Sequence, residues 1–133
     1  MNAHIQLDNL LHHFAKACKT SLRIDKGVCA LYGDDQREAA VLEMPPGSTI
    51  LFIHCEISTQ LIANQELLNL LMKMNFEANA MRGCWLAIDE YNTLRLCTQH
   101  GIGSLNEQQF TSLLIAFIAL VKDVRATLGS LIQ

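Results

Sequence analysis

Apolar positions at the two ends of the chain recur with the spacing of helices. The first such segment covers about 5–19, with apolar side chains three and four residues apart, and it predicts an amphipathic helix. The last begins at Ser104 and Glu107, which are spaced as a capping box, and ends near Leu131. It is so rich in apolar residues that we expect its first half, including Ile115, to be buried nearly all round. The stripe of the first helix consists of Leu7, Leu10, Leu11, Phe14 and Cys18.

Between these helices, short apolar runs are separated by turn-forming residues. Runs at 27–33, 36–44 and 49–57 are separated by acidic and proline-glycine turns, and 84–89 and 93–99 form a second pair. Such short links connect only antiparallel neighbours, so the pattern predicts two antiparallel groups of strands. In the third run one apolar face consists of Leu51, Ile53, Cys55 and Ile57.

The stretch LLNLLMKMN, residues 67–75, is too apolar for a helix that has one solvated face. Asn64 is a suitable N-cap for this helix, which we expect to run to about Asn79, and Gly83 ends the segment that follows. The helix must contact something on more than one side: its own core, a second copy of the chain, or a client. The whole order predicts one α+β domain over 1–133, with a five-stranded antiparallel sheet and three helices in the order α-β-β-β-α-β-β-α.

Composition and charge narrow the classes of partner. With 133 residues, 50% of them apolar, and a mean hydropathy of +0.20, the chain has ample material for a core. A net charge of −3 argues against nucleic acid as the main partner, because clustered cations supply that affinity. The cations that do cluster are interpreted as a solvated helix end; they are Lys16, Lys19, Arg23 and Lys26.

Neither a membrane nor a secretory route is indicated. The longest uncharged apolar stretch, QQFTSLLIAFIALV, has 14 residues, whereas a bilayer requires about 20. The N-terminal residues lack the basic region and the continuous apolar run of a signal peptide. The five cysteines show no CxxC spacing and have apolar or small neighbours, which favours buried thiols in a reducing compartment. The sequence therefore predicts a cytoplasmic protein without a membrane partner.

We find no constellation of residues that would carry out a reaction. His12 and His13 are adjacent on a helix and point about 100° apart, which disfavours a shared metal ion. His54 and Cys55 are adjacent on a strand and face opposite sides of the sheet, so they cannot pair as base and nucleophile. The glycines at 101–103 precede a helix but lack the remaining residues of a phosphate-binding motif. We therefore expect no catalytic residues, no metal and no cofactor.

Apolar surface remains to be placed once the core is filled. The helix over 67–75, Trp85 and the partly apolar second face of the third strand are difficult to bury in one small protein. An exposed apolar patch usually marks an interface. Two interpretations stay open here, a well-packed small core and a dimer formed through the helix over 64–79 and the adjoining strand.

The chain as a whole resembles the class I chaperones of bacterial type III secretion, the Tir chaperone family. The resemblance rests on the amphipathic first helix, on LRIDKGVCALYG, on LLNLLMKMNFEANAMRGCWLAIDEYNTLRL and on the long C-terminal helix. One departure is the turn DEYNT, which replaces the usual glycine turn; Asn92 can supply the left-handed conformation there.

The resemblance implies a cytosolic homodimer that holds the N-terminal chaperone-binding segment of a secreted effector in an unfolded state, without ATP. It also implies the secretion-apparatus ATPase as a further partner. The dimer interface would consist of Leu67, Leu70, Leu71, Met74 and Trp85. The effector-binding residues would be Leu10, Phe14, Val28, Ala30, Val41 and Phe52.

A different class of function stays open beside the chaperone. The same sheet and helices would also suit a small dimeric ligand-binding or regulatory domain. The two readings differ in what the protein retains when it is purified from its host: a secreted protein in the first case, a small molecule in the second.

Overall fold

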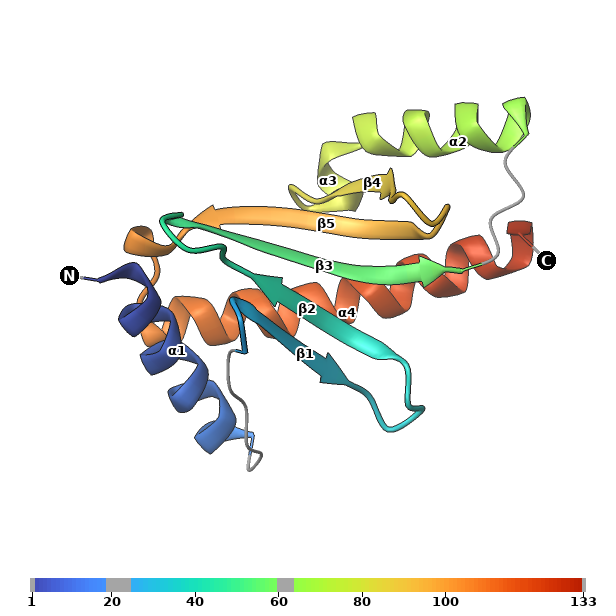
Figure 1. The fold of residues 1–133 in the computed structure, drawn as a ribbon. Helices are drawn as coiled ribbons and strands as arrows, with labels where there is room; N and C mark the ends of the chain where they lie inside the picture. Colours follow the sequence, from blue (N-terminus) through green and yellow to red (C-terminus); the bar gives the residue numbers. More distant parts are fainter. Residues whose placement is uncertain (1, 19–24, 60–63, 133) are drawn as a thin grey trace.

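A computed structural model describes residues 2–18, 25–59 and 64–132, with the side chains of 130–132 left aside. Its elements follow the order expected from the sequence, with one short helix and a 3₁₀ turn added (Figure 1). The predicted end of the first helix at Lys19, and the predicted roles of Lys19 and Arg23, lie outside the described residues. The elements are α1 (Ala3–Ala17), β1 (Val28–Tyr32), β2 (Glu38–Glu43), β3 (Ile50–Ser58), α2 (Gln65–Phe76), α3 (Ala78–Met81), β4 (Trp85–Ile88), β5 (Leu94–Gly101), η1 (Ile102–Ser104) and α4 (Glu107–Ile132).

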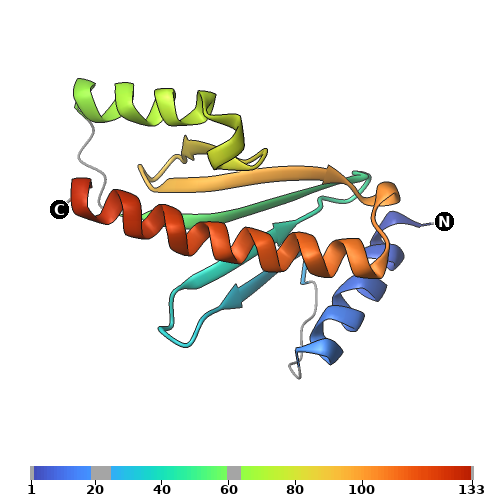
Figure 2. The same ribbon diagram turned by 180° about the vertical axis from the view of Figure 1, so that it is seen from behind.

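The five strands form one antiparallel sheet in the order β1-β2-β3-β5-β4, which confirms the predicted fold class. The long helix α4 crosses one face of the sheet, with α1 beside its N-terminal end (Figures 1 and 2). We call this the inner face. The helices α2 and α3 lie at the edge formed by β4 (Figure 1).

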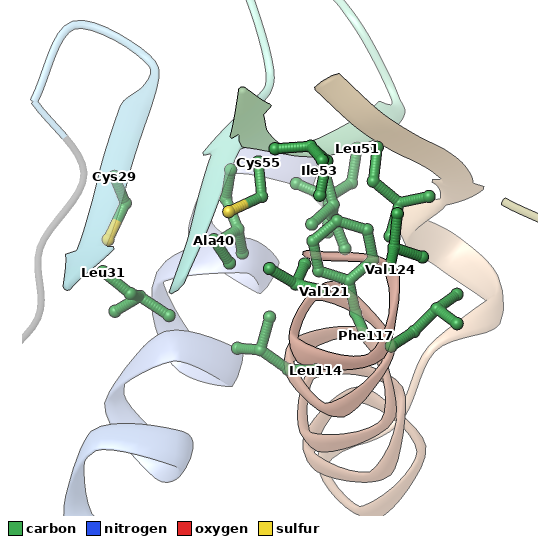
Figure 3. Close-up of a cluster of buried hydrophobic side chains, with 14 of the residues drawn as sticks. Cys29, Leu31, Ala40, Leu51, Ile53, Cys55, Leu114, Phe117, Val121 and Val124 are labelled. Atoms are coloured by element: carbon green, nitrogen blue, oxygen red, sulfur yellow. The ribbon is translucent and has the colours of Figure 1, made fainter. Parts of the chain in front are cut away.

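The core lies between the inner face and the two helices α1 and α4. The alternation predicted for β3 is confirmed, since Leu51, Ile53 and Cys55 are fully buried and Ile57 is 5% exposed. Figure 3 shows Leu51, Ile53 and Cys55 facing side chains of α4. Most of the predicted α4 seam is buried with them: Phe110, Leu114, Phe117, Val121, Val124 and Leu128.

Three details of the sequence prediction for α1 and α4 are wrong. Cys18 is exposed, because α1 ends one residue earlier and Cys18 is its C-cap. The capping box uses Asn106 and Gln109, which bond each other's backbone N–H groups at 2.8 and 3.0 Å, because η1 occupies Ser104. Ile115 is 56% exposed, because α1 and the sheet cover only one side of α4.

The turns on either side of α2 and β4 agree with the sequence. The side chain of Asn64 accepts a hydrogen bond from the backbone of Leu67 at 2.8 Å, so it is the N-cap. Asn92 adopts the left-handed conformation with φ 62°. The second helix ends at Phe76 rather than at Asn79, and α3 follows it before a turn in which Arg82 and Gly83 both have positive φ.

One arginine of α4 holds the sheet together where β2 and β3 diverge. Only three residue pairs, all at one end of β2, connect β2 to β3. The two strands separate beyond the pair of Val41 and His54 (Figure 1). There the guanidinium of Arg125 donates to the carbonyl oxygens of Glu38 and Glu56 at 2.8 and 2.6 Å. These bonds replace a backbone ladder that the strands no longer form, since buried carbonyl groups need partners.

Candidate functional site

The helix α2 presents apolar side chains on two sides. On its inner side Leu71 is 5% exposed, and Leu67 and Met74 are half-buried against the core. The outer side carries three large apolar side chains spaced four residues apart, with exposures of 38%, 69% and 88% in chain order. We call these residues the α2 stripe: Leu68, Met72 and Phe76.

The structure does not bring the five residues predicted for a dimer interface together. Leu71 belongs to the chain's own core, and Leu67 and Met74 are packed against that core. Leu70 is 36% exposed, and Trp85 is half-buried on the face of the sheet opposite the helices. The sequence prediction missed the α2 stripe, because apolar residues lie on more than one side of this helix and the spacing of four alone does not show which side is covered.

A polar side chain fixes α2 to the edge strand β4. The side-chain amide of Asn75 donates to the carbonyl of Leu86 at 3.1 Å and accepts from the N–H of the same residue at 2.7 Å. This pair of bonds occupies backbone groups that an edge strand would otherwise offer to another strand. Because Asn75 and Leu71 point to the chain's own sheet, the α2 stripe is turned away from it.

The outer face of the sheet, opposite α1 and α4, carries an aromatic row beside a charged network. The rings of Phe52 and His54 are stacked with centroids 4.9 Å apart, and Phe52 and Trp85 are 6.4 Å apart. Arg95 donates to Nδ1 of His54 at 3.2 Å, and Nε2–H of His54 donates to Glu43 at 2.8 Å. These contacts assign the proton of the neutral imidazole to Nε2 and leave no base free on that ring.

The ends of the same network are carboxylates. Arg95 donates to Asp89 at 2.8 Å and to Glu38 at 3.0 Å. The hydrogen bond from Arg95 is the largest cause that lowers the pKa of Asp89 below its ordinary value. A guanidinium with a carboxylate on each side is a structural link between strands rather than a free anion-binding group.

The predicted effector-binding residues lie on two faces. Leu10 and Phe14 are buried in the core, where the rings of Phe14 and Phe110 meet edge to face at 6.3 Å. The other four share the outer face, because Ala30 pairs with Val41 while Val28 and Phe52 both pair with Glu43. The sequence prediction missed Tyr32, which continues the alternation of β1 and is 66% exposed. We call these outer residues the outer-sheet surface: Val28, Ala30, Tyr32, Val41 and Phe52.

The outer-sheet surface lies at an open edge of the sheet. Among the described residues, β1 pairs with β2 on one side only, apart from the single bridge between Asp25 and Val28. Val28 is 40% exposed and Ala30 is exposed, so apolar side chains accompany this edge, although the backbone of Val28 itself already bonds Asp25 at 2.9 and 3.0 Å. An extended segment of another protein could add to such an edge through main-chain hydrogen bonds.

The thiols near these surfaces are unsuited to nucleophilic chemistry. Burial raises the pKa of Cys55 to about 12 and that of Cys97 to about 11. Both therefore stay protonated near neutral pH, and the thiolate is the reactive form. His54 and Cys55 point to opposite faces of β3, as their adjacent positions on a strand require.

Neither a metal site nor a membrane-spanning helix is present in the part of the chain that the structure describes. No group of three or more His, Cys, Asp or Glu side chains lies close enough to hold a metal ion. No helix in this part is both long enough and apolar enough to cross a membrane.

Solved structures share this arrangement of helices and strands. The structure of the ExsC-ExsE complex contains a chain with a TM-score of 0.77 and 18% identity, over 99% of this chain and 97% of that one. A chain of the HopA1-SchA chaperone-effector complex has a TM-score of 0.74 and 14% identity, and the match covers 93% of this chain and 96% of that one. A chain of the ExoU-SpcU complex from the type III secretion system of Pseudomonas aeruginosa has a TM-score of 0.68 and 15% identity. This match covers 96% of this chain and 98% of that one. At these identities the likeness shows the fold.

The sequence itself gives the family. No curated protein matches this chain. The model of the Tir chaperone protein (CesT) family, however, matches residues 9–125, which include every strand, α2, α3 and most of α1 and α4. The chain therefore belongs to the Tir chaperone protein family of type III secretion chaperones.

Proposed function

We propose that the protein is a cytoplasmic, homodimeric chaperone that binds the N-terminal chaperone-binding segment of a type III secreted effector and keeps it unfolded. One observation of the structure carries the proposal: apolar side chains line an open strand edge, in the outer-sheet surface. A folded partner would not need that edge, whereas an extended segment gains main-chain hydrogen bonds from it and places alternate side chains on the same surface.

In this proposal the effector segment contacts the outer-sheet surface directly. Val28, Ala30 and Phe52 are contact residues, and Tyr32 joins them, whereas Val41 is 7% exposed and acts through its strand partner Ala30. Leu10 and Phe14 act indirectly, because they are buried and hold α1 against α4. The segment must contact a large area, since ordering a disordered chain costs several kcal/mol.

The second copy covers the α2 stripe. Burial of a Leu, Met or Phe side chain contributes about 1.5–3 kcal/mol, and a two-fold interface counts each residue twice. Leu70 lies on the other flank of α2 and Trp85 on the outer face of the sheet, so neither belongs to the stripe. Leu67, Leu71 and Met74 hold α2 on its own sheet. Methionine at the centre of the stripe suits an interface, because its unbranched side chain adapts to the opposite surface.

The proposed mechanism is passive and does not use ATP. The chaperone occupies apolar side chains of the effector that would otherwise aggregate or fold too early. The protonated thiols and the internally bonded His54 support a binding protein rather than an enzyme. Delivery to the secretion-apparatus ATPase is part of the same proposal.

The test is capture of the client from a host with an active type III secretion system. The tagged chaperone is purified under secretion-inducing conditions, bound proteins are identified, and their protease-protected segments are mapped. We expect a secreted protein, protected near its N-terminus, with two copies of the chaperone. Val28→Glu should reduce the yield, whereas Ile115→Glu, a matched control on an exposed apolar residue of α4, should not. Recovery of a small molecule, or of no secreted protein, would contradict the proposal.

A further inference from the structure

The inner face has a small hollow on the side of α4 away from α1. It lies between α4, the last residues of β5 and the turn between α3 and β4. Its volume is about 160 Å³ and its lining is mostly apolar. The hollow is lined by Leu113, Ala116, Phe117 and Leu120 of α4, with Cys84, Thr98 and His100 beside them and Arg82 and Gly83 at the turn.

The size of the hollow limits what can occupy it. A cavity of about 150 Å³ lined by apolar side chains holds one benzene ring, whereas small-molecule sites usually have about 300–1,000 Å³. The hollow of about 160 Å³ therefore has room for one apolar side chain. A cofactor or a metabolite of ordinary size is too large for it.

The polar groups of the hollow are neutral. Burial raises the pKa of the Cys84 thiol, and burial lowers the pKa of His100, so both groups favour their uncharged forms near neutral pH. Thr98 is 4% exposed and its hydroxyl lies 3.4 Å from Nε2 of His100. The interior of the hollow thus suits an apolar side chain better than a charged one.

The mouth of the hollow carries a cation that is free to pair. Arg82 is exposed, and its guanidinium makes no hydrogen bond or ion pair with any residue that the structure describes. Its backbone adopts φ 52° beside Gly83, and Arg82 is the C-cap of α3. The other arginines near the sheet, Arg37, Arg95 and Arg125, are all bonded within the chain.

We propose that this hollow is an anchor site for a polypeptide segment of a partner in which a large apolar residue is adjacent to an acidic one. The apolar side chain fills the space between α4 and β5, and the carboxylate pairs with Arg82. Charge complementarity and the volume together select this occupant. The site goes beyond the proposed function, because it lies on the opposite face of the sheet from the outer-sheet surface and none of its lining residues belongs to the α2 stripe.

The test uses blocked dipeptides and the intact ¹⁵N-labelled protein. N-acetyl-Phe-Glu-amide is titrated while backbone amide signals are followed, with the Phe-Gln and Phe-Lys analogues as comparison. We expect saturable shifts at 82–84, 98–100 and 113–120 with a millimolar dissociation constant, as one anchor residue allows. The Glu peptide should bind more tightly than the Gln peptide, and the Lys peptide most weakly.

Two pairs of variants separate the site from the rest of the surface. Ala116→Leu places a larger side chain in the hollow and should weaken binding at least fivefold, whereas Ala119→Leu, on the same exposed side of α4, should not. Arg82→Gln should abolish the preference for Glu over Gln, whereas Lys122→Gln should keep it. Circular dichroism checks that each variant is folded.

Several results would overturn the inference. These are shifts spread over other surfaces, an absence of binding, equal binding of the Glu and Gln peptides to the unmodified protein, and an unchanged affinity of Ala116→Leu. A dilution series of the protein alone gives a further control. If the same signals move with protein concentration, a second copy occupies the hollow and the peptide assignment is wrong.

Discussion

The helices α2 and α4 are both rich in leucine and other apolar residues, yet the fold treats them differently. In α4 the seam from Phe110 to Leu128 is at most 5% exposed against the sheet and α1. In α2 only Leu71 is buried, although apolar residues lie on two sides of the helix. The comparison shows that apolar content does not decide burial. A helix that crosses the middle of a sheet buries its apolar side in the core. A helix at the edge of the sheet leaves part of its apolar surface exposed, where another protein can bind it.

The largest expected effect is a loss of folding stability when a buried side chain of α4 is shortened. Phe117→Ala should lower the free energy of unfolding by about 3–5 kcal/mol, because it leaves a cavity between α4 and the sheet. Urea denaturation at fixed protein concentration measures the loss. Ile115→Ala, on the exposed side of α4, is the matched control, and we expect it to change stability by less than about 0.5 kcal/mol. Similar losses in both variants would contradict the contrast between the two sides of α4.

A charge in the α2 stripe should act on association rather than on folding. Phe76→Glu removes about 2 kcal/mol of burial from each half of a two-fold interface, so the dimer should weaken about a thousandfold. Sedimentation equilibrium measures the dissociation constant, and circular dichroism checks the fold. The control is Glu77→Gln, beside the stripe. A dimer that persists in Phe76→Glu, or a monomeric unmodified protein, would remove the α2 stripe from the proposed interface.

The polar attachment of α4 gives an intermediate effect. Arg125→Met keeps the aliphatic part of the side chain but leaves the carbonyls of Glu38 and Glu56 without their donor. Unsatisfied buried groups cost about 1–3 kcal/mol, and we expect a loss of that size with faster amide exchange where β2 and β3 diverge. Arg37→Met breaks a partly exposed ion pair with Glu56 and a single hydrogen bond to the carbonyl of Ile57, so it should cost less than Arg125→Met, about 1 kcal/mol. Equal losses would show that the position of Arg125 has no special role.

The attachment of α2 is weaker and can be tested at one residue. Asn75→Ala removes both side-chain bonds to Leu86 and should cost about 1–2 kcal/mol, because typical hydrogen bonds contribute about 0.5–1.5 kcal/mol each. Hydrogen exchange at the amide of Leu86 should accelerate more than exchange in β3. Asn69→Ala, on the exposed side of α2, is the control. Unchanged protection of Leu86 would mean that Asn75 does not fix α2 to β4.

The smallest expected effect is a dependence on pH. Burial lowers the pKa of His100 in the folded protein, so the unfolded chain takes up a proton first as the pH falls through the ordinary value near 6.5. Stability should therefore decrease from neutral pH toward pH 5, and it should become level below the folded pKa. His100→Gln should make this slope shallower. Denaturation at several pH values compares the two proteins, and identical slopes would exclude a contribution from His100.

The sequence by itself determined the order of the elements and the side of each strand that faces the core. Both depend on the pattern of neighbouring residues. For this reason the α+β class, the buried face of β3, the N-cap Asn64 and the left-handed Asn92 could be predicted from the sequence. The box at Ser104 and Glu107 was predicted wrongly because Asn106 and Gln109 have the same spacing, and only the path of η1 selects between them.

Only the tertiary structure decided which apolar surfaces stay open. A periodic pattern shows that α2 has two apolar sides, but it contains no information on which side meets the sheet. That choice depends on contacts distant in sequence, such as those of Asn75 with Leu86 and of Leu71 with the core. The same holds for Phe14, whose ring meets that of Phe110 nearly 100 residues away, and for Leu10 in the same core. It holds also for the hollow at Arg82, which exists only because the turn after α3, the end of β5 and α4 meet there.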